Sequence, residues 1–128
     1  MGLDTYAMRE TEEFDENNDV VMTGLDDSLF DGIHLIGGMC SGGSGSHSFR
    51  GKCYDDDVEK ITGQSLYQES IAPVTVKEMA RKITIKVGQQ EDCKHVGNDW
   101  DCESCRLTHL KRWFQVAAEN DAYVVGWW

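Results

Sequence analysis

The chain has 128 residues, of which 40% are hydrophobic and one is proline, a composition typical of a single globular domain. It carries 23 acidic residues against 12 Lys and Arg, so its formal net charge is −11. Nucleic acids and anionic membranes attract clustered Lys and Arg, so this charge argues against both as partners. The N-terminus lacks the basic-then-apolar order of a signal peptide, and we expect a cytoplasmic protein.

The first 31 residues hold ten acidic residues, one basic residue and scattered apolar side chains. Because a purely acidic tail has few apolar residues, we expect residues 1–31 to form an acidic N-terminal arm that packs on the body. Residues 15–19 have the Asp-x-Asn-x-Asp spacing that opens an EF-hand calcium loop. Val20 stands where that loop needs glycine and Asp26 where it needs glutamate, which favours a solvated acidic segment over a calcium site.

Residues 32–128 predict a single compact α+β domain with two main amphipathic helices and a small sheet. Apolar residues at 33–36 and 49–54 predict two strands, one on each side of a glycine-rich loop. The three acidic residues at 55–57 begin a short predicted helix, because carboxylates are favourable at the positive end of a helix. Gly63 is expected to end this helix.

The two main helices are predicted over residues 73–87 and 104–118. Apolar residues recur at helical spacing in both segments, and Pro73 suits a first helical position. The β-branched and aromatic residues at 122–128 predict a closing strand. We expect the two apolar stripes to be buried together, with these residues in contact across one core: Val76, Met79, Ile83, Leu107, Leu110 and Phe114.

Four short motifs are distributed over most of the chain: MGLDTY at residues 1–6, SFRGK at 48–52, TGQSL at 62–66 and GWW at 126–128. In these motifs the chain resembles a group of small uncharacterised bacterial and phage proteins that begin Met-Gly-Leu-Asp-x-Tyr and end Gly-Trp-Trp. The resemblance implies a single intracellular domain and carries no activity, cofactor or catalytic residue. The cysteine-rich stretch at residues 93–105 departs from the pattern of the group.

A candidate zinc site is indicated by Cys93-x-His95 followed by Cys102-x-x-Cys105, with His109 as an alternative fourth ligand. Thiolate and imidazole are the usual ligands of structural zinc, and a helix N-terminus favours thiolates over thiols. Five cysteines are an odd number, which argues against a disulfide framework. The alternatives are ordinary loop thiols, an oxidised pair or a catalytic thiol pair.

The glycine-rich loop at residues 37–52 is a second candidate site. Backbone N–H groups beside glycines, together with hydroxyls and cations, can hold an anion, and the candidate ligand-binding residues are His47, Arg50 and Lys52. The spacing of its glycines and lysine does not match a P-loop. The alternatives are a solvent-exposed hairpin loop, or Cys40 acting as a nucleophile with His34 or His47 as base.

Together these observations favour a small non-enzymatic protein that binds a partner, either a protein or a small molecule, with a structural zinc as a local addition. No residue is assigned a catalytic role. The competing hypothesis is an enzyme or an anion-binding protein that uses the glycine-rich loop. Trp113, Trp127 and Trp128 fit a core or a subunit interface better than a nucleic-acid stacking platform, so an oligomer is compatible with the sequence.

Overall fold

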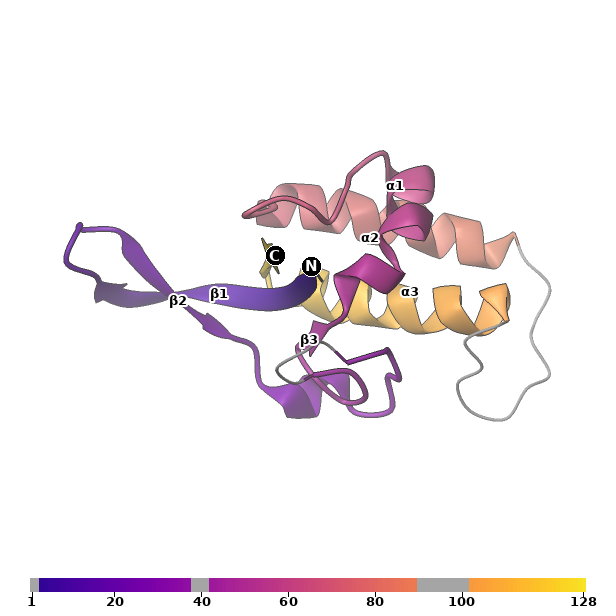
Figure 1. Ribbon diagram of the computed structural model, residues 1–128, viewed down its shortest axis with the longest axis horizontal. Coiled ribbons are helices and arrows are strands. Elements are labelled where there is room, and N and C mark those ends of the chain that lie inside the picture. Colours follow the sequence, from indigo (N-terminus) through magenta and orange to yellow (C-terminus); the bar gives the residue numbers. More distant parts are fainter. Residues whose placement is uncertain (1–2, 38–41, 90–101) are drawn as a thin grey trace.

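The computed structural model describes residues 3–37, 42–89 and 102–128 (Figure 1). Over these residues, one four-stranded antiparallel sheet and three α-helices confirm the predicted α+β class. No helix in this part of the chain has the length and apolar character needed to cross a membrane. In chain order the elements are strand β1 (Asp4–Phe14), strand β2 (Val20–Gly24), 3-10 helix η1 (Asp27–Phe30), strand β3 (Ser48–Phe49), 3-10 helix η2 (Gly51–Cys53), helix α1 (Asp55–Thr62), helix α2 (Pro73–Gly88), helix α3 (Glu103–Glu119) and strand β4 (Tyr123–Trp127).

Strand β1 is the centre of the sheet and pairs with the other three strands. β4 lies along one edge of β1, from Asp4 opposite Trp127 to Met8 opposite Tyr123. The other edge of β1 pairs first with β3 and then with β2, whose Gly24 lies opposite Met8. Only the first half of β1 therefore has a neighbouring strand on both sides in the described structure.

Beyond Met8 the paired strands β1 and β2 continue as a two-stranded ribbon, residues 9–23, which we call the distal hairpin. Figure 1 shows that it extends away from the helices. The Asp15 carboxylate closes its turn by accepting hydrogen bonds from the backbone N–H groups of Asn17 at 2.9 Å and Asp19 at 3.0 Å. The acidic segment with calcium-loop spacing is thus a hairpin turn, and the N-terminal arm, for which no strand was predicted, supplies two strands of the sheet.

The core lies between the inner face of the sheet and helices α2 and α3. Ala7 of β1, Phe49 of β3 and Val124 of β4 are buried in it. Trp113 of α3 lies at its centre, with its ring centroid 4.7 Å from that of Phe49, and its indole N–H donates to the backbone oxygen of Ser46 at 3.2 Å. All six residues predicted to be buried on α2 and α3 are at most 1% exposed and belong to this core, which confirms that prediction.

The helices begin and end where local chemistry predicts. α2 starts at Pro73. Proline is favourable there because the N–H that it lacks would make no hydrogen bond within the helix at the first position. α1 ends at Gly63, which adopts a left-handed conformation with φ of 77° and donates its N–H to the Glu59 oxygen at 2.8 Å. The predicted short helix, both main helices and the closing strand are confirmed within one or two residues.

The two strands predicted around the glycine-rich loop are wrong in most of their length. Residues 33–36 have no regular secondary structure, and Ile36 instead donates its N–H to the Tyr54 hydroxyl at 3.0 Å. Of residues 49–54 only Phe49 lies in a strand, because the chain turns into η2 at Gly51. A side chain at Gly51 would place its Cβ 2.0 Å from the Thr5 hydroxyl oxygen, so this close approach to β1 requires glycine.

Candidate functional site

The glycine-rich loop positions the three predicted anion-binding residues at its C-terminal end. His47 is held by Asp27 of η1, whose Oδ1 lies 2.7 Å from the ring Nδ1 and accepts the backbone N–H of His47 at 2.9 Å. Arg50 is half-buried and Lys52 is exposed. Within the described residues no hydrogen bond or ion pair joins these three side chains, and the alternative nucleophile Cys40 lies outside the described ranges.

His47 is fixed on both sides of its ring. A Cβ atom at Gly24 would lie 2.4 Å from Nε2, so the ring packs directly on the backbone of β2. The bonds from the backbone N–H and then the side chain of His47 lower the pKa of Asp27, which keeps this carboxylate ionised. An anion that approached Nδ1 would have to displace Asp27.

The zinc prediction concerns residues near the start of α3. Cys93 and His95 lie outside the described residues. Cys102 is the N-cap residue of α3, and Cys105 is buried in its first turn. In the part of the chain that the structure describes, no three Cys, His, Asp or Glu side chains are grouped as metal ligands. A zinc site that includes Cys93 and His95 stays a prediction.

His109, the alternative ligand, lies one turn beyond Cys105 and is also buried. Its Nδ1 accepts the backbone N–H of His34 at 3.1 Å, so only Nε2 could bind a metal without breaking this bond. Burial, followed by the nearby charges of His34 and Arg112, lowers the pKa of His109. The neutral imidazole that results is the form that both accepts this hydrogen bond and binds metals.

A surface that was not predicted lies on the face of the sheet opposite the core. Cross-strand neighbours share a face, and the register places Tyr6 opposite Val125 and Met8 opposite Tyr123. Trp127 is 65% exposed, and the other apolar side chains of this face are half-buried. We call this surface the open face and define it by six residues: Tyr6, Met8, Met22, Tyr123, Val125 and Trp127.

Acidic residues border the open face and continue along the distal hairpin. Glu10 shares the face, where it lies opposite Met22 and accepts a hydrogen bond from the Tyr123 hydroxyl. Near the hairpin turn, the Phe14 side chain is 63% exposed. Arg9 is the one basic residue of this ribbon, against six acidic ones: Glu10, Glu12, Glu13, Asp15, Glu16 and Asp19. The open face is therefore an apolar patch beside a strongly negative ribbon.

Comparisons of this chain with protein families, curated proteins and solved structures find no match. The signal for the open face was present in the sequence as apolar residues at adjacent positions in segments 6–8 and 122–128. It could be interpreted as a surface only after these two segments were known to pair.

Proposed function

We propose that this protein is a small, cytoplasmic, non-enzymatic binding protein that holds a protein partner on its open face. One observation carries this proposal. Trp127 is 65% exposed, and it lies beside the half-buried apolar side chains of the same sheet face. Exposed apolar patches with a polar border are typical of interaction sites, and Trp and Tyr are enriched among residues that dominate binding energy. The odd number of cysteines supports the cytoplasmic location.

The charge around the open face defines the chemistry of the partner. Glu10 lies at the border of the open face, and the other carboxylates of the distal hairpin continue from there. A docked partner would therefore meet negative charge along this border. A partner with apolar side chains at its centre and Lys or Arg at its border would match both features. A second copy would bring like charges together across a symmetric interface, in a chain whose net charge is already −11. We therefore infer a basic protein surface rather than self-association.

The experiment compares three immobilised full-length chains as baits in a lysate of cells that produce the protein. They are the wild type, Trp127→Ser on the open face, and Val74→Ser, which removes a 75% exposed apolar residue from α2. We expect a basic protein to bind the wild type and the Val74 variant. Once that protein is purified, its affinity for the Trp127 variant should be at least about tenfold lower.

Salt provides a second readout, because attraction between the acidic border and a basic partner weakens as ionic strength rises. The proposal fails if every captured protein binds the Trp127 variant as well as it binds the wild type. It also fails if sedimentation equilibrium shows a wild-type dimer that Trp127→Ser dissociates, since a second copy would then occupy the open face. A monomer with a Trp127-dependent, salt-sensitive partner supports it.

A further inference from the structure

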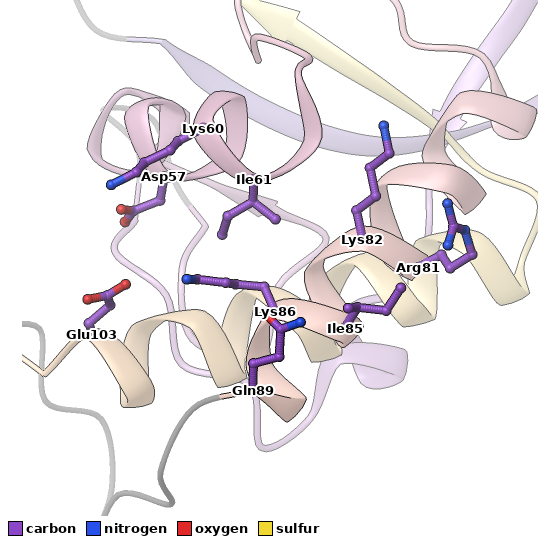
Figure 2. A pocket seen from close by; sticks show the side chains of 9 residues that line it. All are labelled: Asp57, Lys60, Ile61, Arg81, Lys82, Ile85, Lys86, Gln89 and Glu103. Carbon is purple, nitrogen blue, oxygen red and sulfur yellow. The ribbon is translucent and has the colours of Figure 1, made fainter.

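A cleft of about 500 Å³ lies where α1, the second half of α2 and the start of α3 meet (Figure 2). Its volume falls in the range of about 300–1,000 Å³ that is usual for small-molecule sites. It lies among helices rather than on the open face, and it uses none of the residues of the glycine-rich loop or the predicted zinc site. Two isoleucines, Ile61 of α1 and Ile85 of α2, supply apolar surface inside it.

The charge of this cleft is opposite to that of the molecule. The cleft is lined by four basic residues and two acidic ones, whereas the whole chain has 12 basic and 23 acidic residues. One of the two acidic residues, Asp57, is already paired with Arg106 of α3 at 2.8 Å. The four basic residues are Lys60, Arg81, Lys82 and Lys86.

Two of these cations have no partner in the described structure. Arg81 is paired with Glu78, and the Lys82 amine donates to the Thr62 backbone oxygen at 3.2 Å. Neither a hydrogen bond nor an ion pair is present for Lys60 or Lys86 within the described residues. In Figure 2 both side chains extend toward the same end of the cleft, Lys60 from α1 and Lys86 from α2, and Ile61 lies between the two helices.

Of the two lysines of α2 that line the cleft, Lys86 is the one whose amine is available to an anion. Lys82 and Lys86 are four residues apart, but the Lys82 amine is bonded to the Thr62 backbone oxygen and extends in a different direction from Lys86 (Figure 2). A bound anion would give the Lys86 amine the acceptor that it lacks. Ile61 and Ile85 would at the same time bury the apolar part of a ligand.

We propose that this cleft binds a small organic anion, with its phosphate or carboxylate held by Lys60 and Lys86 and its apolar part against Ile61 and Ile85. This site is separate from the open face, so a small molecule and a protein partner can be bound at the same time. Binding in this cleft requires both the anionic group and the apolar part of the ligand. An inorganic anion or a neutral ring alone should bind more weakly than a molecule that combines them.

The experiment uses phenyl phosphate as the probe and follows the amide signals of the full chain by NMR. We expect saturable shifts of the amides of Lys60, Ile61 and Ile85–Gln89, and weaker binding of inorganic phosphate and of benzyl alcohol. Lys86→Gln should lower the affinity for phenyl phosphate at least about tenfold, because it removes a charge-assisted hydrogen bond. Ile85→Ser should weaken phenyl phosphate binding but not the binding of inorganic phosphate.

Lys77→Gln is the matched control, because it removes the same charge from the same helix at a residue that pairs with Asp121 and does not line the cleft. Its affinity for phenyl phosphate should stay within about twofold of the wild type. The proposal is overturned if phenyl phosphate causes no saturable shifts, or if Lys77→Gln and Lys86→Gln weaken binding equally. Equal binding of inorganic phosphate and phenyl phosphate would overturn the role of the isoleucines.

Discussion

Asp27 connects η1 to the glycine-rich loop through a single carboxylate oxygen. This oxygen accepts the backbone N–H of His47, lies 2.7 Å from its Nδ1 and is 3.4 Å from the hydroxyl of Ser46. These bonds lower the pKa of Asp27 below its ordinary value of 3.8, so the folded chain binds a proton at this group less readily than the unfolded chain. The ionised carboxylate therefore stabilises the fold, and the loop depends on it for its attachment.

The stabilisation by Asp27 should depend on pH. It is fully present above about pH 5, where Asp27 is ionised in both states, and it is lost as the pH falls through the folded pKa. Because the carboxylate is largely exposed, we expect Asp27→Asn to lower the free energy of unfolding by less than about 1 kcal/mol at neutral pH. The difference from the wild type should shrink toward zero in acid, as measured by urea unfolding at a series of pH values.

Asp31→Asn is a suitable control, since Asp31 is also exposed and its carboxylate accepts no hydrogen bond within the described residues. It should change the stability little at any of these pH values. A difference between wild type and Asp27→Asn that stays constant from neutral to acidic pH would contradict the role assigned to the ionised carboxylate.

Among the elements, the helices could be predicted because their signals are local. Pro73, Gly63 and the apolar stripes of α2 and α3 act within a few residues of chain. β1 could not be predicted in this way. Its inward residues Thr5 and Ala7 alternate with Tyr6 and Met8 of the open face, so apolar side chains occur on both faces and the expected alternation is hidden.

The candidate surfaces were missed for a related reason. The open face depends on pairing between β1 and β4, at opposite ends of the chain, and the cleft depends on packing of α1 against α2. Neither arrangement follows from spacing along the sequence. The motifs that were visible, the glycine-rich loop and the hairpin turn of Asp15, have hydrogen bonds that hold the backbone in place. These segments resembled an anion-binding loop and a calcium loop because tight turns use the same residue types, glycine and aspartate, as those binding motifs.

Two glycines near helix ends should respond to substitution with opposite signs. Gly63 ends α1 with φ of 77°, whereas Gly88 is the last residue of α2 and has no such conformation, and a Cβ at either position would meet no atom within 4 Å. Gly63→Ala should therefore destabilise the protein by about 1 kcal/mol through backbone strain alone. Gly88→Ala should be neutral or stabilise it by up to about 1 kcal/mol, because alanine favours helix and restricts the unfolded chain.

Thermal and urea unfolding of both variants measure this difference. Each substitution adds the same methyl group in open space, so the pair isolates the backbone conformation from packing. Equal effects of the two substitutions would show that the left-handed conformation at Gly63 carries no energetic cost.

The packed core and the proposed binding surface lie in parts of the molecule that differ in stability. The core unites the inner face of the sheet with α2 and α3, whereas the distal hairpin is a two-stranded ribbon whose residues are half-buried or exposed. A two-stranded ribbon is only marginally stable without a packed face. The region that we expect to contact the border of a partner is thus also the region that should open most easily, and association would stabilise it.

Amide hydrogen exchange should separate these two parts of the molecule. Core amides of α2 and α3 should exchange only when the whole chain unfolds, whereas amides of the distal hairpin should exchange through local opening. Leu110→Ala tests this division, because Leu110 is 1% exposed in the core and its truncation should cost about 2–5 kcal/mol. In this variant the core amides should exchange faster in proportion to the lost stability, and the hairpin amides should keep their wild-type rates.

Equal acceleration in both regions would mean that the hairpin opens only together with the core, and that it does not form a separate unit. Unequal acceleration has a consequence for binding. Because the hairpin opens without the core, a partner that orders it need not change the packing around Trp113, and the cleft between α1 and α2 would keep its shape when the open face is occupied. When a partner binds, the gain in exchange protection should then be largest for amides of the distal hairpin. The core amides can gain less, because their exchange is already close to the limit set by global unfolding.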